Sequence, residues 1–198
     1  MDARQRRSQE RLYAAIVELA EHTPVDALSV TTVAETAGVH RSTFYEHAAS
    51  PGDLLRAALS AELDEIRTRH LGEPGLDLAE ALRRTTYGVA EHLRSHAAAY
   101  RRGLAPDAGS GSLVTMLAEH FLASSRMLRD DGRLRLDLSV PRLADHVTVD
   151  AALGFVAFGT VGAARAWLED GRRRDPSTFL ALDQALLPAW WSAPAGPS

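Results

Sequence analysis

The sequence has no cysteine and no lysine. Without cysteine there can be no disulfide bonds and no zinc site with thiolate ligands, which suits a reducing compartment. The basic residues are all arginine, which we attribute to genome composition rather than to function. The uncharged, apolar stretch 151–164 in the C-terminal half is too short to span a bilayer. No apolar run follows residues 1–7, so we expect no secretory signal and a cytoplasmic protein without a membrane segment.

The composition is that of a folded protein. With 198 residues, of which 45% are hydrophobic, the chain can bury the core of one domain or of two small ones. The net charge of −4 argues mildly against a nucleic-acid binder. Four arginines nevertheless cluster near the start, where they can meet phosphates: Arg4, Arg6, Arg7 and Arg11.

Residues 29–47, SVTTVAETAGVHRSTFYEH, predict two short helices joined by a tight turn. Ser29 is expected to cap the first helix, because its side-chain oxygen can accept from a free backbone N–H group. Val33 and Ala37 then fall on one face of that helix. Gly38 can adopt the left-handed conformation in which helices often end. The pattern indicates a helix-turn-helix.

The second helix, expected over 40–47, turns Phe44 inward and leaves polar side chains outside. A helix fits the DNA major groove, where base edges present a distinguishable pattern of donors and acceptors. The residues expected at base edges are His40, Arg41, Ser42 and Thr43. Those expected at phosphates are Thr31, Thr32, Tyr45 and His47. The alternative interpretation is an ordinary helical hairpin, or a helical pair that binds another protein.

Several motifs follow one another without a gap through residues 8–56: Val33-Ala34, Ala37-Gly38-Val39, Thr43-Phe44-Tyr45, His47 and Asp53-Leu54-Leu55. In this combination they resemble the DNA-binding domain of TetR-family transcriptional regulators. The chain departs from the usual pattern at Ala48, where the family has Phe, and at Pro51, where it has Lys. The resemblance implies an all-α fold, with an N-terminal three-helix helix-turn-helix domain over 1–50 and a C-terminal helical ligand-binding and dimerisation domain over 51–198.

Apolar periodicity predicts further helices over 8–21, 51–71, 76–95, 97–102, 113–129, 141–169 and 177–191. The helix over 51–71 begins in the first domain and ends outside it, so we expect it to couple the two domains. The loop over 103–112 lacks the Gly-Lys-Ser/Thr ending of a phosphate-binding loop, and this argues against a nucleotide site there.

Small residues alternate with aromatic residues in the helix expected over 141–169, which allows another backbone to approach closely. The resemblance implies that the last two long helices pair with their copies as a four-helix bundle. Two helix-turn-helix domains in one dimer would also give specificity for a pseudo-palindromic operator. We therefore expect a homodimer with these interface residues: Gly154, Phe158, Gly162, Trp167, Phe179, Leu182 and Leu186.

A small-molecule effector is expected in a mostly apolar pocket of the second domain. Its candidate lining residues, each of which is also compatible with a place in the core, are Tyr87, His96, Tyr100, Met116, His120, Phe121, His146 and Phe155. His92 and His96 have the spacing of two metal ligands on a helix, but local hydrogen bonding is the better interpretation. We expect no metal and no cofactor.

The function predicted from these patterns is that of a DNA-binding transcriptional regulator, a repressor released by its effector. A helical protein-interaction module without DNA binding is the alternative, followed by an enzyme that uses the C-terminal pocket. The sequence contains no nucleophile elbow and no paired carboxylates, so we expect no enzyme activity.

Overall fold

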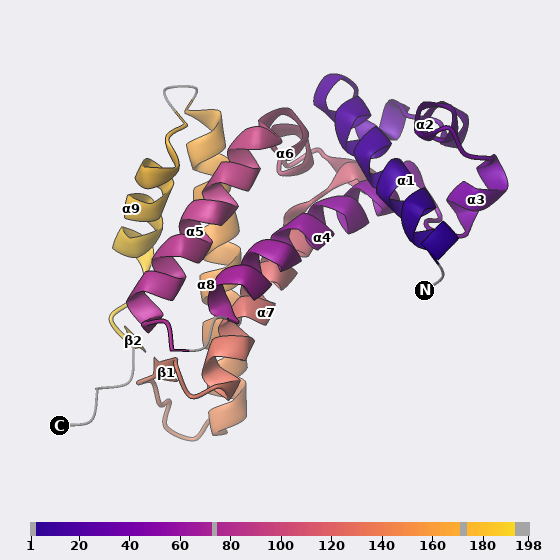
Figure 1. The fold of residues 1–198 in the computed structure, drawn as a ribbon. Coiled ribbons are helices and arrows are strands. Elements are labelled where there is room, and N and C mark those ends of the chain that lie inside the picture. The colour runs from indigo at the N-terminus through magenta and orange to yellow at the C-terminus, as the bar shows by residue number, and fades with distance from the viewer. Residues whose placement is uncertain (1–2, 73–74, 171–173, 193–198) are drawn as a thin grey trace. The chain divides into compact units, whose positions relative to one another are not determined.

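The computed structural model describes residues 3–72, 75–170 and 174–192. Within these ranges the fold is all-α, as predicted, with helices α1 to α9 and two short 3-10 turns (Figure 1). The described residues also include two strands of two residues each, β1 (Arg135–Leu136) and β2 (Trp191–Ser192), which pair antiparallel. The sequence did not predict this pair.

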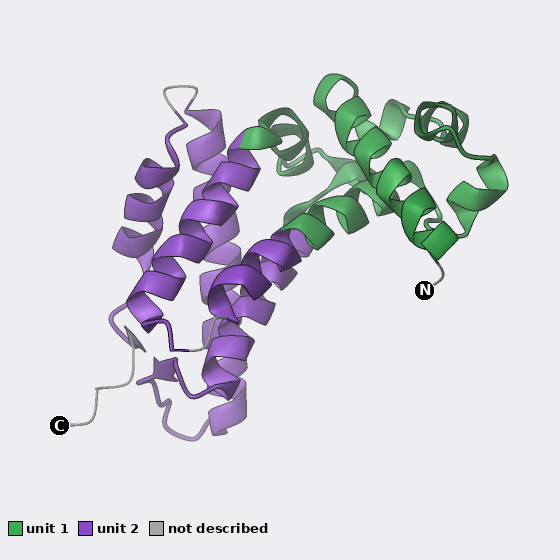
Figure 2. Cartoon of the chain, viewed as in Figure 1, with its two compact units in different colours: residues 1–62, 95–114 green, residues 63–94, 115–198 purple. Residues whose placement is uncertain are grey.

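The chain forms two compact units, which Figure 2 distinguishes by colour. Unit 1 consists of residues 1–62 and 95–114, and unit 2 of residues 63–94 and 115–198. From the sequence, the domain boundary was predicted at residue 50. The structure instead divides helix α4 (Pro51–Leu71) between both units and returns a later segment, 95–114, to the N-terminal one.

Unit 1 contains the predicted helix-turn-helix. Its elements are α1 (Ala3–His22), η1 (Val25–Ala27), α2 (Val30–Ala37), α3 (Arg41–Tyr45), the first half of α4, α6 (Ala97–Gly103) and η2 (Gly109–Gly111). Its core is made of fully buried apolar side chains, among them Leu12, Ile16, Val33, Phe44, Leu54 and Leu59. Helix α1 begins earlier than the predicted residue 8, because exposed arginines are good helix formers although they add nothing to an apolar stripe.

Polar contacts hold the segment 95–114 in unit 1. The Arg102 guanidinium donates to the carbonyl oxygen of Ala20, at the end of α1. Arg56 on α4 donates to the carbonyl oxygen of Ser110 at 2.8 Å. The Ser110 hydroxyl donates in turn to the Asp26 carboxylate on η1. These partners are far apart in sequence, so periodicity within one helix could not reveal them.

His96 bridges two carboxylates inside unit 1. Its Nε2 lies 3.0 Å from Oε2 of Glu62 on α4, and its Nδ1 lies 3.7 Å from Oε1 of Glu21 on α1. The hydrogen bond with Glu62 raises the pKa of His96, although burial opposes this shift. His96 therefore joins α1 to α4 and does not line an effector pocket.

We expect His96→Gln to destabilise the protein more at low pH than at high pH. Because the pKa of His96 is raised in the folded state, its contribution is complete below the unfolded value and declines as pH rises through the folded value. Urea unfolding should show a loss of about 1 kcal/mol at pH 6 and a smaller one at pH 9. His22→Gln, at an exposed position of α1, is the control. An equal loss at both pH values would contradict the charged bridge.

Unit 2 is built from the second half of α4, from most of α5 (Leu78–Ser95) and α7 (Val114–Asp130), and from α8 (Asp145–Glu169) and α9 (Pro176–Leu186). Helix α9 ends before the predicted residue 191, because Leu187 is extended (ψ 129°) ahead of Pro188. Of the turn predicted between α8 and α9, residues 171–173 lie outside the described part. One cluster of the core consists of Leu71, Ala81, Leu128, Leu134 and Leu153, with Trp191 packed against it.

Within the described ranges, α8 is the one helix long and apolar enough to cross a bilayer, judged by length and composition alone. A core helix passes the same test. One side of α8 is buried in unit 2 through Leu153, Val161 and Leu168, and its other side exposes Phe155 and Phe158.

Candidate nucleic-acid interface and ligand cavity

Local interactions fix the turn between α2 and α3. The Ser29 hydroxyl oxygen accepts from the backbone N–H of Thr32 at 3.0 Å, which confirms the predicted cap of α2. Gly38 ends the helix with φ 60° and ψ 42°, in the left-handed region that favours glycine. Arg11 on α1 donates to the Gly38 carbonyl oxygen, and a Cβ at this position would meet its guanidinium. The turn is therefore held from two sides.

Helix α3 has only one full turn and depends on its anchor residue. It spans Arg41–Tyr45, shorter than the predicted 40–47, and follows the extended residue His40. Phe44 is fully buried, and its ring meets Tyr45 edge-on at a centroid distance of 5.6 Å. Because so short a helix cannot be stable by itself, the burial of Phe44 sets which side chains of α3 face outward.

The residues predicted to contact DNA lie on this segment with different exposure. Tyr45 is 55% exposed, and Thr43 and His47 are half-buried. The remaining predicted contact residues are all exposed, namely Thr31, Thr32, His40, Arg41 and Ser42. Two acidic residues of the same segment, Glu35 and Glu46, are exposed as well.

His47 has a partner inside unit 1. Its Nε2 lies 2.9 Å from the hydroxyl oxygen of Ser8 on α1, which ties the chain just after α3 to the first helix. Ser8 and Arg11 therefore position the helix-turn-helix, a role that was not predicted from the sequence. Their partners stand 39 and 27 positions along the chain, beyond the reach of any local pattern.

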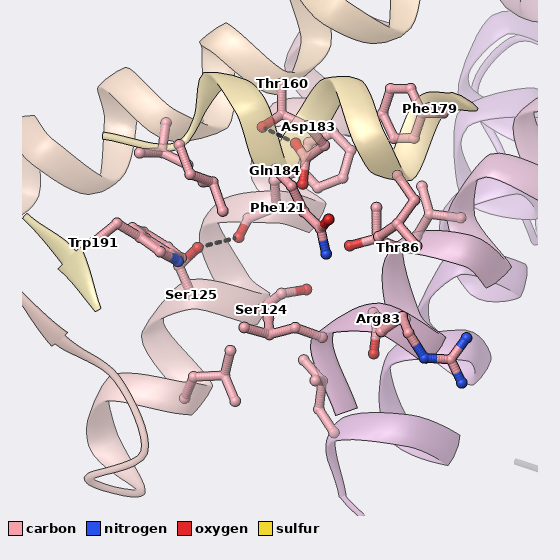
Figure 3. Close-up of a pocket in the computed structure, with 18 of the residues that line it drawn as sticks. Arg83, Thr86, Phe121, Ser124, Ser125, Thr160, Phe179, Asp183, Gln184 and Trp191 are labelled. Atoms are coloured by element: carbon pink, nitrogen blue, oxygen red, sulfur yellow. Dashed lines mark hydrogen bonds between the residues drawn. The ribbon is translucent and has the colours of Figure 1, made fainter. Parts of the chain in front are cut away.

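Unit 2 contains a cavity of about 250 Å³, part of which is shown in Figure 3. It is mostly apolar and is lined from α4, α5, α7, α8 and α9 and by Trp191. Only His120 and Phe121 of the eight predicted pocket residues line it.

The other predicted pocket residues are placed elsewhere, which corrects the expected lining. Tyr87 and Phe155 are 43% and 69% exposed, His146 is exposed and Met116 is buried outside the cavity lining. His96 and Tyr100 belong to unit 1. The sequence identified aromatic and histidine residues on the helices but could not fix how each helix is rotated about its axis.

His120 is a neutral group at the cavity. Its Nδ1 lies 3.4 Å from Nη1 of Arg67 and 3.7 Å from Oδ1 of Asp64. Burial, followed by the charge of Arg67, lowers the pKa of His120 to about 4. Its Nε2 is buried and has no hydrogen-bond partner among the described residues.

Asp183 on α9 is the partly buried carboxyl group of the cavity. Its Oδ1 accepts from the Thr160 hydroxyl on α8 at 3.2 Å, a contact drawn in Figure 3. Burial raises the pKa of Asp183, and the hydrogen bond from Thr160 opposes this shift. Asp183 was not predicted as a pocket residue, because one acidic residue on an amphipathic helix is expected to face solvent.

The predicted dimer-interface residues divide into two groups. Trp167 and Phe179 are buried within unit 2, where their ring centroids lie 5.4 Å apart and the Trp167 indole donates to Thr178 at 2.9 Å. These two side chains pack in the core and not on an exposed face. Phe158 and Leu186 are 56% and 59% exposed. Gly162 is exposed, and Gly154 and Leu182 are half-buried.

The fold is similar to those of several solved structures. No protein-family model and no curated protein sequence matches the chain. Among solved structures, the FadR repressor of Thermus thermophilus, solved with lauroyl-CoA, is 22% identical with a TM-score of 0.60 over 96% of this chain and 100% of its own. The dihydroxyacetone kinase operon activator DhaS is 15% identical, with a TM-score of 0.61 over 93% of this chain and 98% of its own.

A TetR transcriptional regulator from Rhodococcus sp. is 17% identical, with a TM-score of 0.57 over 94% of this chain and 98% of its own. The described residues thus form an all-α chain with an N-terminal helix-turn-helix. This chain has the fold of the TetR-family transcriptional regulators, as the sequence motifs predicted.

Proposed function

We propose that this protein is a homodimeric DNA-binding transcriptional regulator of the cytoplasm. The observation that carries the proposal is the segment from Ser29 to His47. Most of its polar residues are exposed around a short helix, and four of its apolar residues are buried in unit 1, namely Val33, Ala34, Ala37 and Phe44. A helix held in this way can enter the major groove with its N-terminal residues toward the bases.

The side chains divide by chemistry into base contacts and phosphate contacts. Arg41 stands at the first position of α3, and its guanidinium can hold guanine O6 and N7 with two hydrogen bonds. His40, Ser42 and Thr43 can add adaptable contacts to base edges. Thr31 and Thr32 lie at the start of α2, where backbone N–H groups and the helix dipole also favour a phosphate. Tyr45 and His47 complete the proposed phosphate contacts.

The exposed apolar face of α8 supports the dimer. Phe155 and Phe158 lie on it, and Leu186 on α9 is exposed as well. A Cβ built at Gly154, Gly159 or Gly162 would meet nothing within 4 Å, so the protomer itself does not require glycine there. Each glycine inside a helix costs about 1 kcal/mol relative to alanine. Close approach of a second α8 would explain both the glycines and the exposed aromatics.

We expect Phe158→Glu to separate the dimer, because the change would bury two charged groups against each other and remove the packing of both aromatic rings. Sedimentation equilibrium should show a dissociation constant higher by about a hundredfold or more. Leu138→Glu is the matched control, since Leu138 is an exposed apolar residue outside α8 and α9. A Phe158→Glu protein that remains as dimeric as the control would place the interface elsewhere.

The cavity of unit 2 is the proposed effector site. Helix α4 contributes Leu71 to the cavity lining and Leu54, Leu55 and Leu59 to the buried residues of unit 1. An effector that favours one conformation of α4 would lower operator affinity by the difference in its affinity for the two states, commonly about 1–3 kcal/mol. We propose release of a repressor as the direction of this response.

Selection of bound fragments from the source genome tests the function. The purified protein should enrich fragments that share a motif with two-fold symmetry, and footprinting should protect two half-sites that lie a whole number of helical turns apart. Uniform recovery of fragments, without a common motif, would reject the proposal.

A further inference from the structure

The cavity of unit 2 is lined by an acidic side chain for which the described residues show no salt bridge. Among the residues that line it, only Arg83 and Asp183 carry a formal charge. Arg83 is bound to Glu80 at 2.7 Å with half of its side chain exposed, and Figure 3 shows its guanidinium pointing away from Asp183. Asp183 lies at the cavity and accepts one hydrogen bond from the uncharged Thr160.

Three hydroxyl groups of the cavity also favour a ligand that donates hydrogen bonds. Thr85 donates to the carbonyl oxygen of Ala81 at 2.7 Å, and Ser124 and Ser125 donate to carbonyl oxygens of their own helix at 2.9 Å. Because each hydroxyl has only one proton, these three groups can offer a ligand only their lone pairs. At these three hydroxyls a ligand carboxylate would compete with a backbone carbonyl for the proton.

His120 does not supply the missing positive charge. It is neutral at pH 7, because burial lowers its pKa to about 4. The cation behind it, Arg67, lies 2.8 Å from Asp64 and is not part of the lining. Since arginine can only donate, Nδ1 of His120 is the acceptor and the ring proton lies on Nε2, as assigned from these partners. That buried N–H can serve an uncharged acceptor atom of a ligand.

We infer that this cavity selects amphipathic cations, that is, small apolar molecules with one protonated amine that pairs with Asp183. The inference rests on the proposed function in that it names the class of effector. Burial of a carboxyl group without a cation is unfavourable, and a bound ammonium would remove this cost while the apolar walls receive the rest of the ligand. A volume of about 250 Å³ corresponds to about eight water molecules at ~30 Å³ each, which suits a compact arylalkyl amine. The cavity does not suit an acyl chain that ends in a carboxylate.

Three probes of one shape and different charge test this inference: 4-phenylbutylamine, 4-phenylbutan-1-ol and 4-phenylbutyrate. Calorimetric titration of the full chain at pH 7.5, without DNA, should show the amine binding about tenfold or more tighter than the alcohol, and the carboxylate weakest. Asp183→Asn should abolish the preference for the amine and leave the affinity for the alcohol unchanged, which shows that the cavity is intact. Asp150→Asn removes an exposed carboxylate of the same unit and should keep the preference.

Three results would overturn the inference: no binding of the amine, binding of the carboxylate as tight as that of the amine, or an amine preference that survives Asp183→Asn. Because the titrations contain no DNA, such a result leaves the proposed DNA binding standing. Conversely, if the protein selects no genomic fragments, the proposed function as a DNA-binding regulator is rejected, whether or not the amine binds.

Discussion

Arg41→Ala is expected to weaken binding to the selected operator by about a hundredfold or more. One bidentate contact to guanine contributes about 1–3 kcal/mol, and a homodimer loses two of them. Arg41 is exposed at the start of α3 and has no part in the buried core, so stability should stay within about 0.5 kcal/mol of wild type. Fluorescence anisotropy with the selected fragment, at one fixed salt concentration, measures the change.

Arg126→Ala provides the control for Arg41→Ala. Arg126 lies on α7 in unit 2 with half of its side chain exposed, and it makes one long ion pair, 4.0 Å from Asp150. The same charge is removed, but outside the proposed interface. If both variants bound the operator equally well, Arg41 would have no role in recognition beyond its charge.

Phe44→Ala is expected to lower the free energy of unfolding by about 3–5 kcal/mol, as for other large aromatic residues removed from a core. Phe44 is fully buried and is the anchor of a one-turn helix. Its loss leaves a cavity beneath α3 and also frees the contact residues from their fixed orientation. Urea unfolding followed by circular dichroism measures the stability, and DNA binding should be lost together with it.

Tyr45→Ala separates the effect on stability from the effect on DNA binding. Tyr45 is the next residue and is 55% exposed, so its removal should change stability by less than about 1 kcal/mol while weakening DNA binding, because a phosphate loses its hydroxyl donor. A Phe44→Ala protein as stable as Tyr45→Ala would show that Phe44 does not hold α3 in place.

The sequence predicted the helix-turn-helix closely because its signals are local. A cap at Ser29, a left-handed glycine at 38 and an apolar residue at 44 each determine the backbone within a few positions. The start of α4 was equally predictable from local signals. Ser50 accepts from the backbone N–H of Asp53, and Pro51 occupies the first helical position.

The cavity was harder to predict because its lining depends on how five helices pack. Phe155 and Phe121 look alike in sequence, but the first is exposed on α8 and the second lines the cavity. Asp183 accepts a hydrogen bond from Thr160, which lies on a different helix. The return of 95–114 to unit 1 likewise depends on contacts such as that of Arg102 with Ala20, 82 positions apart.

The net charge of −4 is an objection to DNA binding that the sequence raises, and the structure adds two exposed acidic residues, Glu35 on α2 and Glu46 directly after α3. These acidic groups should suppress binding to random DNA, since non-specific affinity is almost entirely electrostatic. The proposed operator complex depends instead on a few arginine, hydroxyl and imidazole contacts in fixed positions. A high ratio of specific to non-specific binding is the expected consequence.

The dependence of affinity on salt tests the central claim, that unit 1 binds duplex DNA. With about six phosphates neutralised by the arginines near the start of the two subunits, affinity for the selected fragment should fall by about a thousandfold between 50 and ~200 mM salt, because the condensed counterions are released on binding. The slope should stay close to that of wild type in Arg41→Ala, because its proposed contact is with guanine rather than with a phosphate, and it should remain unchanged in Arg126→Ala. An affinity that does not change over this range, in a protein shown to be folded and dimeric, would contradict the account.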